Sequence, residues 1–419
     1  MIVVFFADIF ILLDYSMEQQ IVIQNPHRSW KSIISDWYKV RKKYLNILIE
    51  EINSKKATIL TGLRRIGKTT LMKQVIDYLI KEKKVSPTRI LYYSCDIFWW
   101  IDSLSLLEII QTFRTWNNIA LSEKIYCFID EVTYLENFHT QLKNIVDISA
   151  LHDHTIKLFV TSSSSSIVND QKAMLTWRHR TLLIEPLDYY EYCEFTDKWN
   201  YHDWEYFDEY LSYGWIPEYV LTKNPEVLST IINDIINKDI IIQHAIRDRR
   251  TVFELLLLLL ERVGKELSIT KISHILSISK QTAQKRVNYF HETYLFNFIW
   301  RFGTLNETIR NAKKIYAIDT GIITIYRWIS NKGSLYENSI YNLIKHYEPY
   351  YYYHIWNEID FIIWKRWNYI LIECKYHSKI NTWQKKIMDW FNGTTYIVDW
   401  FKWYEQCYKE ILSTKELLP

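Results

Sequence analysis

The chain is 419 residues long, with 48% hydrophobic residues, 24% charged residues and a formal net charge of +3. This length allows two or three domains with buried cores, and the composition is that of a folded soluble protein rather than a disordered chain. The mildly basic balance neither requires nor excludes a nucleic-acid partner, because a local basic patch matters more than the total charge.

The first fifteen residues are mostly apolar, but they predict neither a membrane span nor a signal peptide. They are shorter than the ~20 residues that cross a bilayer, and they lack a basic flank. Met17 opens a more polar stretch, so translation from Met1 and from Met17 both stay open. The scattered cysteines lack metal-ligand spacing and predict thiols in a reducing compartment: Cys95, Cys127, Cys193, Cys374 and Cys407. We therefore expect a soluble cytoplasmic protein without a membrane partner.

Helical and strand-like segments alternate after this N-terminal stretch. Apolar residues near a 3.6-residue spacing predict amphipathic helices over Ser29–Lys55 and Thr70–Lys81. The apolar runs of strand length are Ala57–Thr61, Ile90–Cys95, Ile125–Ile129 and Lys157–Val160. This alternation predicts an α/β fold with a parallel sheet, which binds its ligand at the carboxyl ends of the strands.

The segment GLRRIGKT, which begins at Gly62, matches the phosphate-binding pattern GxxxxGK[ST] between a predicted strand and a predicted helix. In this pattern the backbone curls around phosphate oxygens, Lys68 neutralises the β- and γ-phosphates, and the Thr69 hydroxyl coordinates Mg2+. Two of only 8 glycines fall at the required spacing, which favours an ATP site over a chance turn. The expected nucleotide-binding residues are Gly62, Arg64, Arg65, Gly67, Lys68, Thr69 and Thr70.

A second motif supports the ATP site. The apolar run from Ile125 ends in two carboxylates, Asp130 and Glu131, some sixty residues after the P-loop. We expect Asp130 to hold Mg2+ together with Thr69, and Glu131 to polarise the water that attacks the γ-phosphate.

Two further catalytic roles have candidates. The run Lys157–Val160 leads into serines, and Ser163 stands where a polar sensor contacts the γ-phosphate or the lytic water; the alternative is a solvated serine loop. Arg178 and Arg180 are candidate arginine fingers, acting within the chain or from a neighbouring subunit, and the alternative is ordinary surface arginines.

The stretch from Leu267 to Phe302 predicts a winged helix, with a first helix over Ile269–Leu276, a turn, a second helix from Lys280, and then strands. The residues of the second helix that could meet phosphates and base edges are Lys280, Gln284, Lys285 and Asn288. The alternative is a protein-packing module, because winged helices also mediate protein contacts.

Acidic residues and a lysine recur in the last hundred residues. Glu337 falls in a predicted helix, Asp360 opens one predicted strand, and Glu373 with Lys375 ends another. Adjacent strands of this kind can bring carboxylates to one Mg2+ and place the lysine beside a scissile phosphate. The pattern resembles the PD-(D/E)xK nuclease core. The alternative is that exposed strand ends simply favour charge.

In sum, these motifs resemble one family, the archaeal and bacterial AAA+ ATPases that carry a C-terminal region of uncharacterised function. The similar segments are GLRRIGKTT from Gly62, IDEV from Ile129, Arg178 with Pro186, Leu187 and Glu191, YLSYGWIPE from Tyr210, and KIYAIDTG from Lys314. Trp177 and Ser162 stand where the family has glycine. The resemblance covers residues 29–395 and implies an ATPase whose back half carries a nuclease-like fold.

We therefore predict an AAA+ ATPase that binds ATP and Mg2+ and acts on DNA through its back half. The expected regions are an extension (1–28), the AAA+ core (29–195), a helical lid or linker (196–262), a winged helix (263–322) and a small restriction-endonuclease-like α/β domain (323–419). The alternative is an ATP-driven signalling switch whose back half binds a protein partner and has no nuclease activity. A homo-oligomer is compatible with both.

Overall fold

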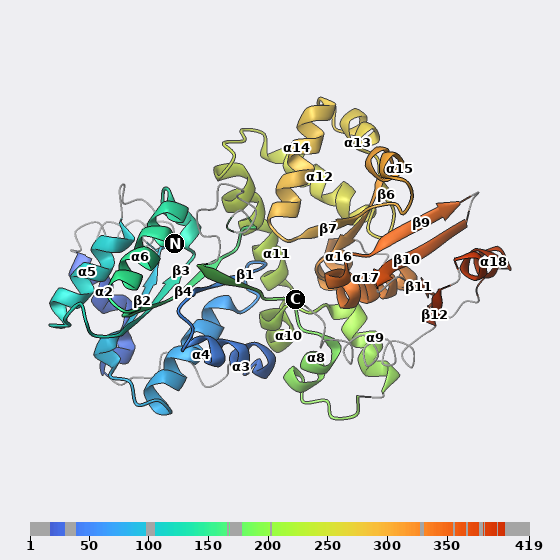
Figure 1. Ribbon diagram of the computed structural model, residues 1–419. Coiled ribbons are helices and arrows are strands. Elements are labelled where there is room, and N and C mark those ends of the chain that lie inside the picture. Colours follow the sequence, from blue (N-terminus) through green and yellow to red (C-terminus); the bar gives the residue numbers. More distant parts are fainter. Residues whose placement is uncertain are drawn as a thin grey trace. The chain divides into compact units, whose positions relative to one another are not determined.

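The computed structural model describes most of the chain, and it divides into one compact unit up to Glu185 and a second from Pro186 onward (Figure 1). The described residues are 17–29, 39–97, 105–165, 167, 178–201, 203–326, 331–354, 357–365, 368–376, 380, 382–391 and 393–398. Within these residues, no helix is both long enough and apolar enough to cross a membrane.

The first unit is built on a five-stranded parallel sheet with the strand order β2-β3-β4-β1-β5. Its strands are β1 (Ala57–Thr61), β2 (Ile90–Ser94), β3 (Ile125–Asp130), β4 (Ile156–Ser162) and β5 (His179–Leu183). Its helices are α2 (Met17–Gln24), α3 (Lys42–Glu51), α4 (Lys68–Lys81), α5 (Leu106–Trp116) and α6 (Phe138–Leu151), with short 3-10 turns at Pro26–Ser29, Pro87–Arg89 and Val132–Tyr134.

Helices cover both faces of this sheet, as parallel strands require (Figure 1). Helix α4 lies on one face, whereas α5 and α6 lie on the other, which follows from right-handed crossovers between parallel strands. The strands β1 and β2 are buried along their whole length. Burial on both faces explains why these strands read as continuous apolar runs in the sequence.

The N-terminal segment covers the edge of the sheet at β2. Asn25 forms two hydrogen bonds with the backbone of Tyr92, one to its carbonyl (2.8 Å) and one from its N–H (2.7 Å). Gln24 accepts from the N–H of Ser94 at 2.6 Å, and His27 Nε2 lies 3.1 Å from the carbonyl of Ile90. These side chains replace a neighbouring strand, which protects an edge that could otherwise pair with another chain.

The helix predicted over Ser29–Lys55 is only partly correct. Residues 39–41 are not helical, and α3 begins at Lys42, while residues 30–38 lie outside the described part. Arg41 has non-helical backbone angles (φ −87°, ψ 83°), and its Nη1 donates to the carbonyl of Glu185 at 2.7 Å. A tertiary hydrogen bond therefore outweighs the helical spacing of the apolar residues at this point.

The second unit begins with a helical region followed by a small antiparallel sheet. The helices are α8 (Tyr189–Phe195), α9 (Trp204–Tyr213), α10 (Pro217–Thr222), α11 (Pro225–Asp234) with a π-helical turn at Ile235–Ile242, and α12 (Arg249–Glu261). Next come β6 (Glu266–Leu267), α13 (Ile269–Ile275), α14 (Lys280–Glu292), β7 (Phe296–Ile299), α15 (Leu305–Arg310) and β8 (Lys313–Ala317). The three strands pair antiparallel in the order β6-β8-β7.

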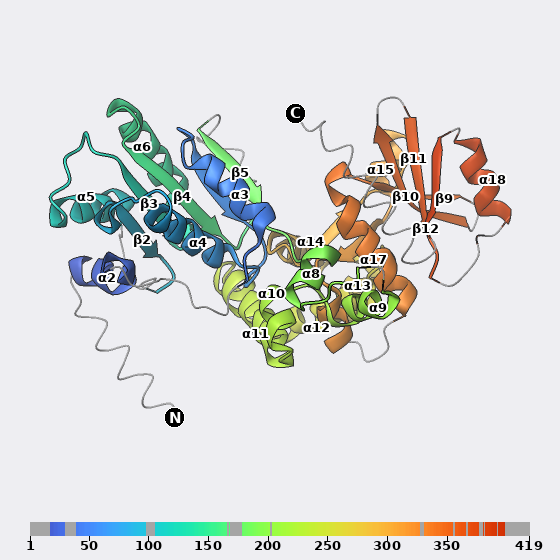
Figure 2. The ribbon, with the colours of Figure 1, turned by 90° about the horizontal axis from the view of Figure 1, so that it is seen from below.

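The end of the second unit holds a four-stranded mixed sheet with the order β12-β11-β10-β9. Its elements are α16 (Thr320–Tyr326), α17 (Lys332–Ile344), a 3-10 turn at Lys345–Tyr347, β9 (Tyr350–His354), β10 (Asn357–Lys365), β11 (Asn368–Cys374), α18 (Thr382–Trp390) and β12 (Thr394–Val398). Strands β9, β10 and β11 are antiparallel, whereas β12 is parallel to β11. Figure 2 shows α18 beside this sheet.

Alternating residues of β10 face two separate cores. Phe361 and Ile363 join the large aromatic cluster that also contains Tyr316, Tyr336 and Tyr351. Ile359 and Ile362 instead join a smaller cluster with Met388 and Phe391. The alternation is interrupted between Ile359 and Ile362, where the pairing of β10 with β9 shifts register as at a β-bulge, so these two residues reach the same core although three positions separate them.

Candidate nucleotide-binding site

The loop between β1 and α4 has the backbone conformation of a phosphate cradle. Gly62 has φ +141°, and a Cβ atom there would lie 2.4 Å from the carbonyl oxygen of Ile184, so no larger residue fits. Gly67 (φ 99°) and Arg65 (φ 57°) are also left-handed. Helix α4 begins directly after Gly67, so its positive end faces the loop.

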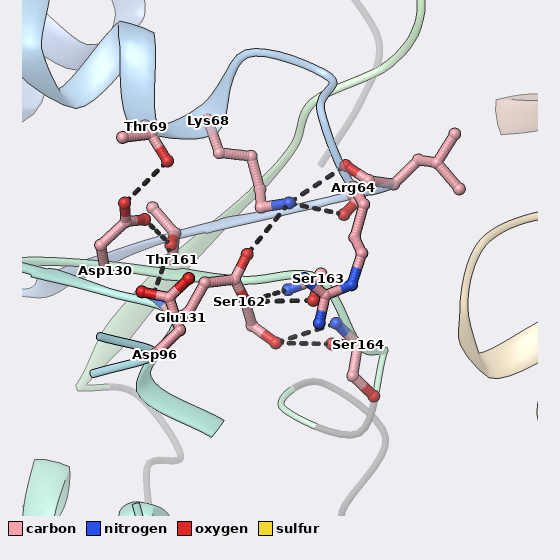
Figure 3. Close-up of polar contacts among 12 residues, drawn as sticks. Arg64, Lys68, Thr69, Asp96, Asp130, Glu131, Thr161, Ser162, Ser163 and Ser164 are labelled. Atoms are coloured by element: carbon pink, nitrogen blue, oxygen red, sulfur yellow. Dashed lines mark hydrogen bonds and ion pairs between the residues drawn. The ribbon is translucent and has the colours of Figure 1, made fainter. Parts of the chain in front are cut away.

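Lys68 folds back over this loop (Figure 3). Its Nζ donates to the carbonyl oxygens of Gly62 at 2.9 Å and Leu63 at 3.0 Å, and it lies 3.7 Å from Glu131 Oε1. The side chain is only 4% exposed. The ammonium therefore lies inside the cradle, where a phosphate chain can exchange with the carbonyl contacts.

Thr69 and Asp130 are in direct contact, although 61 positions separate them in the sequence. The Thr69 hydroxyl donates to Asp130 Oδ2 at 2.7 Å. Burial, followed by the charge of Glu131, raises the pKa of Asp130, while hydroxyl donors oppose this shift. A hydroxyl and a carboxylate are hard oxygen ligands, and Mg2+ bound with a nucleotide needs only one or two of these from the protein. The pair therefore fits Mg2+.

Glu131 sits on a strained backbone and is held by the neighbouring strand. Its φ and ψ are both 50°, an uncommon conformation outside glycine. The backbone N–H and the hydroxyl of Ser163 donate to Glu131 Oε2 at 3.1 Å and 3.0 Å (Figure 3). Strand β4 lies between β3 and β1, and this order brings Ser163 to both the P-loop and the carboxylates.

The remaining P-loop residues take different positions. Arg64 Nη2 donates to the Tyr134 hydroxyl at 2.9 Å, so its guanidinium bonds to the segment after Glu131. Arg65 is exposed, and Thr70 is half-buried in the first turn of α4.

Arg178 and Arg180 lie at the opposite edge of the sheet from the P-loop. The N–H of Ala57, at the start of β1, donates to the Arg178 carbonyl at 2.9 Å, whereas the P-loop follows the other end of β1. A five-residue strand separates the two edges by roughly 16 Å. Arg178 Nε forms an ion pair with Asp147 at 2.8 Å, and Arg180 pairs with Glu51. Neither guanidinium therefore lies beside the P-loop of its own chain, and a finger role for either residue stays a prediction that needs a neighbouring subunit.

Two residues that hold Asp130 were not found from the sequence. The Tyr92 hydroxyl donates to Asp130 Oδ2 at 2.9 Å, and the Thr161 hydroxyl donates to Oδ1. The Thr161 Oγ1 also accepts from the N–H of Glu131 at 2.9 Å. The available signal was a hydroxyl near the end of each neighbouring strand, which becomes informative only once the strand order is known.

A comparison with protein families agrees with this geometry. The family described as an AAA domain matches residues 54–193, a stretch that contains the P-loop, both carboxylates and Ser163. Residues 54–193 are therefore similar to the AAA domains of this family. A domain of unknown function, DUF8612, matches residues 205–332, beyond this first match.

Similar proteins extend over most of the chain. An uncharacterized protein of Haemophilus influenzae is 25% identical over 73% of this chain and 77% of its own length. An uncharacterized protein of Methanocaldococcus jannaschii is 24% identical over 74% of this chain and 72% of its own. Among solved structures, the Walker-type ATPase of Pyrococcus abyssi has a TM-score of 0.44 and 14% identity, covering 69% of this chain and 95% of its own.

Beyond residue 193, three of the four DNA-contact candidates share a groove of about 560 Å3. Lys280, Gln284 and Asn288 line it from α14, together with Trp300 and Lys313 from the segments around β7 and β8. Gln284 Nε2 donates to Asn288 Oδ1 at 3.1 Å. Lys285 is exposed on the same helix but does not line the groove.

The nuclease candidates lie near one another, but two different lysines contact them. Lys314 Nζ contacts Glu337 Oε1 at 2.7 Å, Asp360 Oδ1 at 3.4 Å and Glu358. Glu373 instead binds Lys375 Nζ at 2.8 Å. Among the described residues, no three Asp, Glu, His or Cys side chains are placed to hold one metal ion. The predicted Mg2+ site formed by Glu337, Asp360 and Glu373 is therefore not found among the described residues.

Proposed function

We propose that this chain hydrolyses ATP at the P-loop site and couples this activity to DNA through its back half. The ATPase proposal rests on two contacts between the P-loop and the end of β3. The Thr69 hydroxyl lies 2.7 Å from Asp130 Oδ2, and Lys68 Nζ lies 3.7 Å from Glu131 Oε1. Lys68 would neutralise the β- and γ-phosphates, while Thr69 and Asp130 would hold the Mg2+ that accompanies ATP.

In this proposal Glu131 polarises a water molecule whose oxygen attacks the γ-phosphorus, and the bond to the β–γ bridging oxygen breaks. Ser163 orients the Glu131 carboxylate through its two donors. A hydrolytic role for Arg178 or Arg180 would require a second copy of the chain, because both lie at the far edge of the sheet. A homo-oligomer that supplies the finger in this way is part of the proposal.

The DNA proposal rests on the helix-turn-helix arrangement and the groove beside it. Helices α13 and α14 are followed by an antiparallel pair of strands, which is the order of a winged helix. The groove combines basic side chains, amides and an aromatic ring, since Lys313 Nζ lies 3.7 Å from the Trp300 ring centre. Such a surface suits phosphates and base edges. We propose a winged helix at 263–322 and a nuclease-like fold at 323–419, after a helical lid at 196–262.

The first experiment is Mg2+-dependent ATP turnover with and without single- and double-stranded DNA, with the Lys68→Ala variant as the blank. We expect turnover in the native chain that DNA increases by about twofold or more, and none above background in the variant. Turnover that survives Lys68→Ala would refute the assigned site. Turnover that DNA leaves unchanged would refute the coupling to DNA while leaving the ATPase proposal intact.

The groove makes a separate prediction about affinity. The double substitution Lys280→Ala and Lys313→Ala should weaken binding of duplex DNA by about tenfold or more and reduce the salt slope, because phosphate contacts release fewer counterions. Fluorescence anisotropy at two or more salt concentrations measures both effects.

Lys285→Ala is the matched control, because this lysine lies on the same helix outside the groove. Its affinity should stay within about twofold of the native value. An equal loss in the control and the double variant would show that the groove is not the DNA-binding surface.

One observation favours the second candidate function, a switch that binds a protein. Leu305 and Ile309 on α15 are 76% and 61% exposed, and Ile309 lines the same groove. Exposed apolar side chains of this size suit a protein partner better than a phosphate backbone. ATP turnover that ignores DNA, together with unchanged DNA affinity in the groove variant, would favour this function.

A further inference from the structure

A buried lysine stands at the centre of the carboxylates that resemble a nuclease site. We define the carboxylate cluster as Glu337 on α17 with Glu358 and Asp360 on β10. Lys314 Nζ contacts all three side chains. The Lys314 side chain is only 2% exposed, so the ammonium is enclosed by the cluster rather than lying across its surface.

Strand geometry directs this lysine inward. Neighbouring residues of a strand point to opposite sides, and Lys313 lines the exposed groove, whereas Lys314 is buried. Strand β8 belongs to the three-stranded sheet, and the cluster belongs to the four-stranded sheet and its helix. The lysine therefore comes from a different structural element than the nuclease pattern itself.

One oxygen each of Glu337, Asp360 and Glu373 already accepts a hydrogen bond from a protein donor. Glu337 Oε1 accepts from the Tyr316 hydroxyl at 2.7 Å as well as from Lys314. Asp360 Oδ2 accepts from the N–H of Cys374 at 2.8 Å. Glu373 Oε1 accepts from Gln384 Nε2 at 2.5 Å and pairs with Lys375.

A buried ammonium is stable only with compensating charge, and buried carboxylates need a cation for the same reason. The Lys314 ammonium supplies such a cation to the three carboxylates that it contacts, without a metal ion. A divalent ion placed between these oxygens would lie against the ammonium and would be repelled by it.

We propose that the Lys314 ammonium takes the place of a divalent metal ion in the carboxylate cluster. The native chain then binds no metal ion there and does not cut DNA by metal-dependent hydrolysis. Lys314 instead links the two sheets through its ion pairs, because it lies on β8 of the three-stranded sheet and contacts Glu358 and Asp360 on β10 of the four-stranded sheet. This inference goes beyond the proposed ATPase and does not depend on it.

The test is Mn2+ binding to the full-length, nucleotide-free chain. Binding is measured as the loss of the electron paramagnetic resonance signal of free Mn2+. In the native chain, any bound Mn2+ should disappear in Asp130→Asn, which removes the nucleotide-site ligand, and should be unaffected by Asp360→Asn. Native Mn2+ binding that Asp360→Asn abolishes would overturn the proposal. This comparison uses only variants that keep Lys314.

Removing the lysine should create the missing site. Lys314→Met keeps most of the length of the side chain and removes its charge, so we expect the variant to bind one Mn2+ more per chain than the native protein does. The addition of Asp360→Asn should abolish this gain, and Lys313→Met should show no gain. A folded Lys314→Met chain that gains no Mn2+ would also overturn the proposal. If that variant does not fold, the native comparison decides.

Discussion

Replacing Glu131 with glutamine is expected to slow ATP turnover by about a hundredfold to a thousandfold, because the amide cannot accept a proton from the attacking water. ATP binding should stay within a few-fold of the native value, since Lys68, Thr69 and Asp130 are unchanged. The amide oxygen can still accept the two hydrogen bonds from Ser163, so the geometry of the loop should persist. Single-turnover hydrolysis and equilibrium ATP binding measure the two effects separately.

Glu136→Gln is the matched control for this prediction, because Glu136 is exposed on the segment that follows the site. Its turnover should stay within about twofold of the native value. A Glu131→Gln chain that turns over ATP at the native rate would show that another group activates the water. A chain that no longer binds ATP would show that Glu131 contributes to binding rather than to the chemical step.

The nucleotide site is the part of the molecule that the sequence predicts best, for a physical reason. The P-loop is local, since its glycines, Lys68 and Thr69 fall within eight consecutive positions, and their spacing alone carries the geometry. The predicted strands also agree with β1 to β4 within about two residues at each end, because strands buried on both faces read as apolar runs.

Residues that act through the strand order could not be predicted in the same way. Tyr92 and Thr161 reach Asp130 only because β2 and β4 flank β3 in the sheet. The position of Arg178 likewise depends on β5 lying beside β1 in parallel, which places its first residues at the edge away from the P-loop. No spacing along the chain records these neighbours.

Lys314 is the clearest case of a residue that local patterns misplace. Lys314 opens the segment KIYAIDTG that resembles the family, and no spacing along the chain connects it with the carboxylates at positions 337 to 373. The contact joins two sheets, and a pattern of carboxylates near a lysine at 375 is equally compatible with a metal site. Only the three-dimensional neighbours distinguish a lysine-filled cluster from a metal-binding one.

The same family motif contains a second buried charge, Asp319, which is 0% exposed. Its carboxylate accepts hydrogen bonds from the backbone N–H groups of Trp215, Ile216, Gly321 and Ile322, with the Ile322 contact at 3.0 Å. Burial raises the pKa of Asp319 to about 6, because the loss of water outweighs these donors. A Cβ atom on Gly321 would lie 2.2 Å from the carbonyl oxygen of Tyr213, so the end of α9 and the start of α16 approach closely beside the carboxylate.

Asp319→Ala is therefore expected to destabilise the second unit by about 3 kcal/mol or more, because the substitution leaves several buried N–H groups without an acceptor. For a unit of this size the midpoint of thermal unfolding should fall by about 6–12 °C. Calorimetry of the full chain would resolve the transition.

Asp248→Ala is the matched control in the same unit, because Asp248 is exposed and caps α12 through one backbone N–H, that of Thr251, at 3.1 Å. Its loss should cost only about 1 kcal/mol. Equal shifts in the two variants would show that the buried carboxylate contributes no more than an ordinary helix cap.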